Sequence, residues 1–200
     1  MTVFKSIWFK CIVCLLSIAV VSGALLAILN DLLLVSPEMR TARAIKKIYG
    51  EEKEYSVVLD IDDKERGDEA IIYDGVGSVN KIYEVGSDML FQTTGYKGYK
   101  EGTITLWVLV VNTDGVLSID KVLVQSYKKQ TLMGNLTDNF YGKFQITDVT
   151  AAYNEDKYFF ADKEQDLNIP ENNIVTGATK SSTAAANAVN CVIRYIGESL

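Results

Sequence analysis

Two threonines near the C-terminus lie in a stretch of small residues that could present a hydroxyl group to another molecule. The stretch is Thr176-Gly177-Ala178-Thr179, and Asn173 lies three positions before it. Gly177 permits a turn and Ala178 adds little bulk, so the Thr179 hydroxyl is expected to be accessible. The chain then has the pattern of a helix, and the N-terminus of a helix favours an anion. The pattern predicts an accessible hydroxyl at a helix N-terminus, a position that suits an anion, and the competing interpretation is an ordinary turn before a helix.

The helix that follows is indicated by the spacing of its apolar residues. Ser181 or Ser182 is suited to cap its N-terminus, because a serine hydroxyl can accept from a free backbone N–H group. Six apolar side chains fall on one helical face and predict packing on a core, namely Ala185, Ala188, Val189, Val192, Ile193 and Ile196. We therefore expect a C-terminal helix whose N-terminal end lies beside Thr179.

The Asn-x-x-Thr-Gly-Ala-Thr pattern resembles the flavinylation signature of a family of membrane flavoproteins. The family includes the G subunit of Rnf-type ferredoxin:NAD oxidoreductases and the C subunit of the sodium-pumping NADH:quinone reductase. Its pattern is Asp-x-x-(Ser/Thr)-Gly-Ala-Thr, and the last Thr carries FMN through a phosphoester bond. The resemblance implies that Thr179 carries covalent FMN and that Thr176, Gly177 and Ala178 belong to the attachment site. Asn173 replaces the family's Asp.

A second stretch resembles the same family less closely but over more residues. Gly95-Tyr96-Lys97-Gly98 matches its Gly-Tyr-x-Gly segment, and Asp114-Gly115 further on is typical of a hairpin turn. The family usually continues with Glu-Thr-Pro-Gly-Leu-Gly, a loop that approaches the flavin ring. Here the residues are Gln130-Thr131-Leu132-Met133-Gly134-Asn135. The resemblance implies a ring environment that includes Thr131 and Gly134, with different contacts where Glu and Pro are replaced.

The N-terminal region contains an uncharged apolar run from Cys11 to Leu29. A helix of this length spans roughly the hydrocarbon core of a bilayer. A cleaved signal peptide is the main alternative, since Lys5 and Lys10 precede the run, but the run is long for such a peptide. Residues 1–36 are therefore predicted to be a membrane anchor in the lipid bilayer, and residues 37–200 a single FMN-binding domain. Basic residues flank both ends of the span, so the extracytoplasmic location of the domain is implied by the resemblance.

Composition excludes several classes of function. The net charge is −6 and the basic residues are scattered, which argues against a nucleic-acid partner. The chain has no His and three Cys, so no metal site is predicted, and the redox role implied by the resemblance then requires an organic cofactor. The acidic stretches at residues 60–69 and 155–166 are interpreted as solvated loops. A calcium loop at Asp60, Asp62 and Asp63 lacks the required Gly and distal Glu.

The predicted fold class is α+β, with an N-terminal transmembrane helix followed by a domain with an antiparallel sheet and a C-terminal helix. Further helices are expected at residues 39–49 and 136–144, and turns at residues 74–75, 77–78 and 86–87. Strands are expected at residues 55–61, 70–73, 81–85, 89–94, 101–111, 116–126 and 147–153.

By the resemblance, the chain is an electron-transfer component similar to the G subunit of an Rnf-type ion-translocating oxidoreductase. Its partners are then the other membrane components of a redox-driven ion pump and a flavin transferase that uses FAD. One alternative is a free-standing extracellular flavin electron carrier. The other is a non-redox anchored envelope protein in which Thr176 to Thr179 form only a helix cap.

Overall fold

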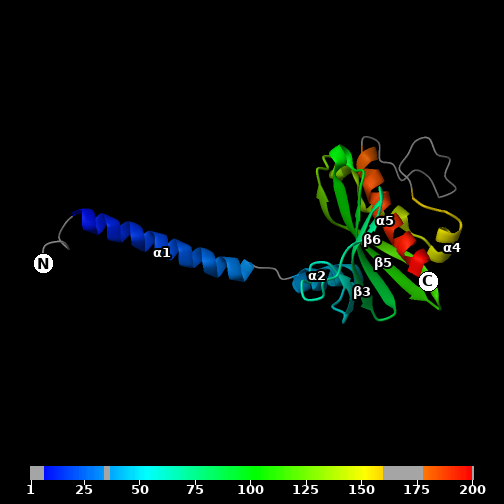
Figure 1. The fold of residues 1–200 in the computed structure, drawn as a ribbon, viewed down its shortest axis with the longest axis horizontal. Helices are drawn as coiled ribbons and strands as arrows, with labels where there is room; N and C mark the ends of the chain where they lie inside the picture. The colour runs from blue at the N-terminus through cyan, green and yellow to red at the C-terminus, as the bar shows by residue number, and fades with distance from the viewer. Residues whose placement is uncertain (1–6, 34–36, 160–177, 200) are drawn as a thin grey trace. The chain divides into compact units, whose positions relative to one another are not determined.

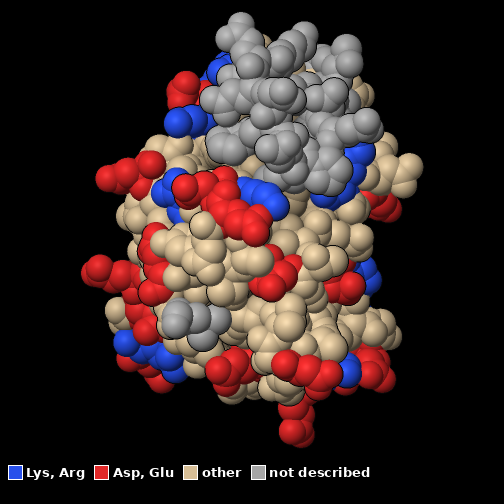
Figure 2. Space-filling view, turned by 90° about the vertical axis from the view of Figure 1, so that its right-hand side faces the viewer, with Lys and Arg blue, Asp and Glu red and all other residues tan. Residues whose placement is uncertain are grey.

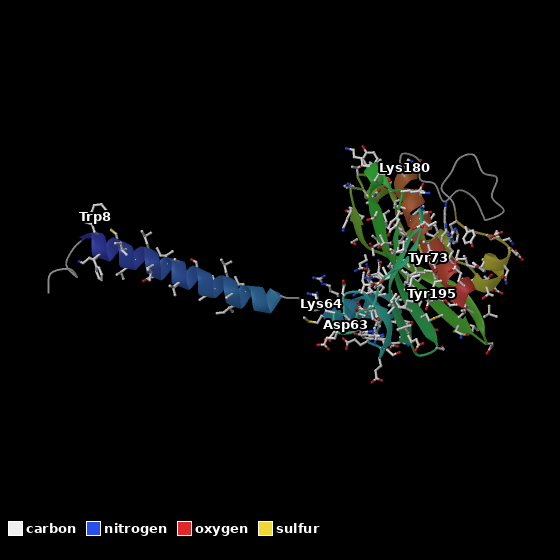
Figure 3. The ribbon with its side chains drawn as sticks, in the orientation of Figure 1. Trp8, Asp63, Lys64, Tyr73, Lys180 and Tyr195 are labelled. Carbon is white, nitrogen blue, oxygen red and sulfur yellow. The ribbon has the colours of Figure 1, made fainter. Side chains whose placement is uncertain are left out.

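The computed structural model describes residues 7–33, 37–159 and 178–199 and divides the chain into two compact units, Met1–Thr41 and Ala42–Leu200. The first unit contains helix α1, Ile7–Leu33. Within α1, residues Trp8–Leu29 form a stretch long and apolar enough to cross a membrane, and their side chains are not buried in the protein. The predicted N-terminal apolar helix is therefore confirmed, and Figure 3 labels Trp8 near its first residues.

The second unit is built on a six-stranded antiparallel sheet with the order β1-β3-β4-β5-β6, in which β2 also pairs with β3 (Figure 1). The strands are β1 Ser56–Asp60, β2 Ile71–Tyr73, β3 Gly77–Val85, β4 Asp88–Gly95, β5 Thr103–Thr113 and β6 Val116–Lys128. Strands β1 and β2 pair with opposite ends of β3, so the loop between them lies along one edge of the sheet.

The helices and short 3-10 turns fill in the rest of the described chain. They are α2 Pro37–Tyr49, η2 Tyr99–Glu101, η3 Met133–Asn135, α3 Asp138–Tyr141, η4 Gly142–Phe144, α4 Val149–Asn154 and α5 Thr179–Ser199. The expected helices at residues 39–49 and 136–144 are confirmed as α2 and as α3 with η4. The chain is thus α+β, with a helix at each end of the sequence and a sheet between them.

Two local predictions are wrong. The turn expected at Gly77-Ser78 is the start of β3, where Gly77 pairs with both Tyr73 and Gly95. The strand expected around residues 147–153 is helix α4. Asp148 caps this helix by accepting a hydrogen bond from the Ala151 N–H group at 2.9 Å, which stabilises the first helical turn.

The two faces of the sheet are buried by different helices. Helix α5 lies over β3, β4 and β5, where all six predicted apolar residues of its core-facing side are buried. On the opposite face Ile45 and Ile48 of α2 pack with Tyr83, Leu90 and Trp107. The alternation of side chains along each strand produces these two cores, because neighbouring residues point to opposite faces.

Gly95 allows α5 to lie directly on β4. A Cβ atom on Gly95 would lie 1.8 Å from the Ala184 carbonyl oxygen and 2.5 Å from the Ala188 nitrogen. Its neighbour across the ladder, Gly77, would bring a Cβ atom to 2.9 Å from the Sγ atom of Cys191. The backbone of the helix therefore crosses the sheet where two glycines face each other, and any side chain there would push it away.

Candidate functional site

Thr179 is the first residue of α5, so the helix begins two residues earlier than the predicted serine cap. Ser181 and Ser182 lie inside the first turn, and the prediction that one of them caps the helix is wrong. The Ser182 hydroxyl instead donates to the Ala178 carbonyl at 3.0 Å, and the Ser182 N–H group donates to the same oxygen at 2.9 Å. The N–H groups that precede Ser182 in the first turn have no acceptor among the described residues, and the positive end of the helix dipole lies beside Thr179.

Thr179 lines a cleft of about 380 Å³ that runs along one side of α5. Three parts of the second unit form it together with α5: the turn before β3, the segment after β4, and the chain just beyond α4. The described lining residues are Gly75, Val76, Lys97, Tyr158, Thr179, Lys180, Thr183, Asn187, Asn190 and Arg194. In Figure 3, Lys180 lies at the N-terminal end of α5, and Tyr73, which contacts Arg194, lies beside its lower half.

The charges of the described cleft residues are all positive. Lys97, Lys180 and Arg194 line it, and no Asp or Glu is among its described lining residues. Within residues 7–33, 37–159 and 178–199, none of these three cations forms an ion pair. On the face shown in Figure 2, acidic side chains crowd the lower edge, and Lys and Arg are more frequent in the upper half. A cleft with this charge in a protein of net charge −6 is suited to an anionic ligand.

Lys97 reaches the cleft because the chain turns sharply after β4. Its φ angle is 63°, a left-handed conformation that costs energy for a residue other than glycine. The Asn187 side chain donates to the Tyr96 carbonyl at 3.1 Å and fixes the preceding residue against α5. The Nζ atom of Lys97 then lies 3.5 Å from the position that a Cβ atom on Gly75 would occupy. The ammonium group is therefore held over the turn at Gly75.

Arg194 is held between two aromatic rings. Its guanidinium carbon lies 5.9 Å from the ring centre of Tyr73 and 5.3 Å from that of Tyr158. Burial raises the pKa values of both tyrosines, so the phenols stay neutral and their ring faces attract the cation. Asn190 positions the chain beside Tyr158, because its amide exchanges two hydrogen bonds with the backbone of Phe159, at 2.8 and 2.7 Å.

The second predicted segment lies beside the start of α5 but outside the cleft. Gln130 is buried, and its Oε1 atom accepts from the Ser181 hydroxyl at 2.7 Å and from the Tyr99 N–H group at 3.2 Å. Thr131 and Gly134 are exposed and are not among the described residues lining the cleft. The segment therefore contacts the first turn of α5 through the hydrogen bond between Gln130 and Ser181. The sequence pattern did not single out Gln130.

The predicted attachment residues are only partly described. Thr179 is half-buried in the cleft and Ala178 is buried beneath it. Thr176, Gly177 and Asn173 lie outside the described residues. The sequence patterns did not single out Tyr158 and Arg194, and they included Lys97 only as the variable residue of the Gly-Tyr-x-Gly segment, but a signal for Arg194 was present. Thr183, Asn187, Asn190 and Arg194 recur every three or four residues and so form a polar stripe along α5.

A second polar cluster lies on the edge of the sheet and is fully paired. The Nζ atom of Lys81 lies 2.8 Å from Oδ1 of Asp60 and 2.8 Å from Oδ2 of Asp62, and its side chain is 4% exposed. The Tyr83 hydroxyl donates to Oδ2 of Asp60 at 2.5 Å. Asp60 is buried, so the interpretation of residues 60–69 as a wholly solvated loop is wrong at its first residue. No group of metal-ligating side chains occurs among the described residues.

The cysteine of the second unit does not take part in the cleft chemistry. Cys191 is buried in the core face of α5, as its position in the helical pattern predicts. Burial raises the pKa of its thiol to about 12, so the group stays protonated and unreactive at neutral pH. The described cleft therefore offers hydroxyl, amide and cationic groups, and no thiolate.

Comparisons with protein families, with curated proteins and with solved structures find no match for this chain. The assignment of a function therefore depends on the cleft and on the motif at its end. Helix α5 contributes to both: Thr179, the last residue of the motif, is its first residue, and its polar stripe forms one wall of the cleft.

Proposed function

We propose that the chain is a membrane-anchored flavoprotein that carries FMN covalently on Thr179. By its resemblance to the Rnf and sodium-pump flavoproteins, it would serve as an electron-transfer component of an Rnf-type ion-translocating oxidoreductase. The main supporting observation is that Thr179, the acceptor threonine of the motif, lines a cleft that contains three cations and no described carboxylate. An ordinary turn before a helix requires no such cleft.

The residues present fit the phosphate end of FMN. A phosphoester on Thr179 would lie at the N–H groups that begin α5, with Lys180 as its neighbour in the chain. The remaining cleft suits a planar, partly polar ring, because it combines Val76 and Tyr158 with the amides of Asn187 and Asn190. Its volume of about 380 Å³ falls within the range typical of small-molecule sites.

Attachment would proceed through the Thr179 hydroxyl. Its oxygen attacks the flavin-side phosphorus of FAD, the pyrophosphate bond breaks, AMP leaves, and the hydroxyl proton is lost. The chain itself lacks His, so a partner flavin transferase would supply the base for this step. Once bound, the flavin supplies the redox chemistry, and the chain's residues hold it, orient it and set its electrostatic surroundings.

The location is proposed to be a cell membrane, with the second unit on the extracytoplasmic side. Helix α1 supports the membrane part of the proposal, because residues Trp8–Leu29 are apolar enough to span a bilayer. The side is taken from the family resemblance. Resistance of the full chain to carbonate extraction, together with an N-terminus at Met1, would support an anchor, whereas a mature N-terminus after residue 24 would indicate a signal peptide.

Replacement of Thr179 tests the attachment. The full chain is co-expressed with an active flavin transferase and examined by intact mass and by flavin fluorescence in a denaturing gel. Wild-type protein should gain the mass of one FMN, and Thr179→Ala should gain none. Thr183→Ala is the matched control, because Thr183 lines the same cleft one turn later and its hydroxyl donates to the Thr179 carbonyl at 3.0 Å. Modification of the Thr179→Ala variant, or an unmodified wild-type protein, would refute the proposal.

The same preparation distinguishes the alternatives. A flavin-bearing chain that runs alone after mild solubilisation indicates a free-standing carrier, whereas co-purification with other redox proteins of the membrane indicates a pump component. A chain that is never modified indicates a non-redox envelope protein. The cleft cations favour the two flavin-bearing alternatives, since a structural cap alone gives no reason for three cations without a described ion-pair partner to line one cleft.

A further inference from the structure

The cleft extends well beyond the end that contains Thr179. Arg194 lies fifteen residues after Thr179 in α5, which at 1.5 Å per residue places the two about 22 Å apart along the helix axis. Thr183, Asn187 and Asn190 line the cleft between them. A ligand that is fixed at Thr179 and stays inside the cleft must therefore extend along this stripe toward Arg194.

The far end of the cleft contains Arg194. Lys97 lies over the turn at Gly75, and the residue before it, Tyr96, accepts a hydrogen bond from Asn187, seven residues before Arg194 in α5. The two rings that flank Arg194 hold its guanidinium group in place, and Arg194 is half-buried. Among the described residues, Arg194 has neither an ion-pair nor a hydrogen-bond partner. The carboxylates of Asp156 and Glu198 act on its two flanking tyrosines without forming an ion pair with it.

We propose that Arg194 forms a second anion subsite that holds the ring end of the flavin and stabilises its reduced, negatively charged form. This inference rests on the proposed attachment of FMN to Thr179. Positive charge close to a redox group favours the state with more negative charge, because the opposite charges attract and the charged form is stabilised. Arg194 is thus assigned as a residue that sets the reduction potential.

Reduction of the ring at this subsite takes up two electrons and one proton. A redox protein partner donates the two electrons, solvent donates the proton to N5 of the ring, and one negative charge is left on the N1 and C2 carbonyl side. Arg194 compensates that charge, so a second proton is not taken up at neutral pH. Without the cation, the reduced ring takes up the second proton more readily and its negative charge is lost.

Arg194→Gln tests the subsite in the full, flavin-bearing protein. The midpoint potential is measured at several pH values by redox titration with dithionite, followed by flavin absorbance. The slope of the midpoint potential against pH gives the number of protons taken up per two electrons. The variant should hold flavin covalently as the wild type does, but its reduced form should be destabilised about tenfold relative to the oxidised form. This change lowers the midpoint potential by about 30 mV for a two-electron couple. Proton uptake should rise from one toward two near neutral pH.

Two further variants separate charge from structure. Arg194→Lys keeps the positive charge and should recover most of the potential and the uptake of one proton. Lys143→Gln removes an exposed cation that is not among the described cleft residues and should leave both quantities unchanged. An Arg194→Gln protein with covalent flavin but wild-type potential and proton uptake would overturn the subsite alone. A folded Arg194→Gln protein without flavin would also overturn it, by assigning Arg194 to attachment. Wild-type protein without flavin would overturn the attachment proposal, and the subsite with it.

Discussion

The cleft along α5 and the cluster around Lys81 both contain cationic side chains, but the surroundings of these side chains differ. In the cluster, one buried Lys is enclosed by two carboxylates at 2.8 Å, and the Tyr83 hydroxyl binds one of them. In the cleft, two Lys and one Arg have no described carboxylate near enough to form an ion pair. The first arrangement is complete within the protein. The cleft arrangement leaves its cations able to bind an external anion.

The difference shows how to separate a structural cation from a binding cation. A buried charge is tolerated only when opposite charge and hydrogen bonds offset its loss of hydration, and Lys81 has both. A partly exposed cation remains hydrated and does not need a counter-charge to be stable. It can therefore be placed where it contacts a ligand.

The largest expected effect is a loss of folding stability when the Lys81 cluster is disrupted. Lys81→Met should leave Asp60 buried without its counter-charge and lower the free energy of unfolding by about 3–5 kcal/mol. Lys46→Met is the matched control, because the Lys46–Glu52 pair is 59% and 78% exposed and should contribute less than about 1 kcal/mol. Urea unfolding of both variants followed by circular dichroism measures the difference. Equal losses would show that Lys81 is not a structural cation.

A smaller effect is expected where α5 rests on the sheet. Gly95→Ala should displace the helix backbone, because the added Cβ atom would lie 1.8 Å from the Ala184 carbonyl oxygen, and should cost about 1–3 kcal/mol. Because one wall of the cleft is α5, flavin attachment should also decrease. Gly142→Ala has no atom within 4 Å of the added carbon and should be close to neutral. Thermal unfolding and gel fluorescence report the two effects, and a wild-type result for Gly95→Ala would contradict the close contact.

The smallest effect is a dependence of stability on pH that belongs to Asp60. Burial alone would raise the pKa of Asp60, but hydrogen bonds from Lys81, Tyr83 and the Asp62 N–H group outweigh it and lower the pKa below its ordinary value. This contribution to stability is therefore complete above about pH 4, the ordinary carboxyl pKa, and is lost as the pH falls through the lower pKa of the folded state.

Asp60→Asn should remove that acid-dependent loss. Unfolding midpoints measured from pH 7 down to pH 3 should fall less steeply for Asp60→Asn than for the wild type, although the variant is less stable at pH 7. Asp114→Asn serves as the control, because Asp114 is an exposed hairpin residue that forms no ion pair with described residues. An unchanged slope for Asp60→Asn would show that the ion pair does not carry this dependence.

Much of the fold could be predicted from local patterns in the sequence. The apolar run of α1, the core face of α5 and the Asp114-Gly115 hairpin each depend on residues close together in the chain, so their period and turn chemistry are visible without contacts. The errors occurred where local signals were ambiguous. Gly77-Ser78 has the composition of a turn, yet Gly77 is required in β3 by the close approach of Thr94 and Cys191.

The sequence by itself determined most of the elements, the apolar N-terminal helix and the threonine at the head of the last helix. Only the tertiary structure decided which side chains share the cleft, since Gly75, Lys97, Tyr158 and Arg194 come from four separate segments. It also decided that Lys81 is enclosed by carboxylates and Arg194 is not. The physical reason is that Coulomb and hydrogen-bond energies depend on distance and burial, and these are set by the packing of α5 and of the β1–β2 loop on the sheet rather than by residue type.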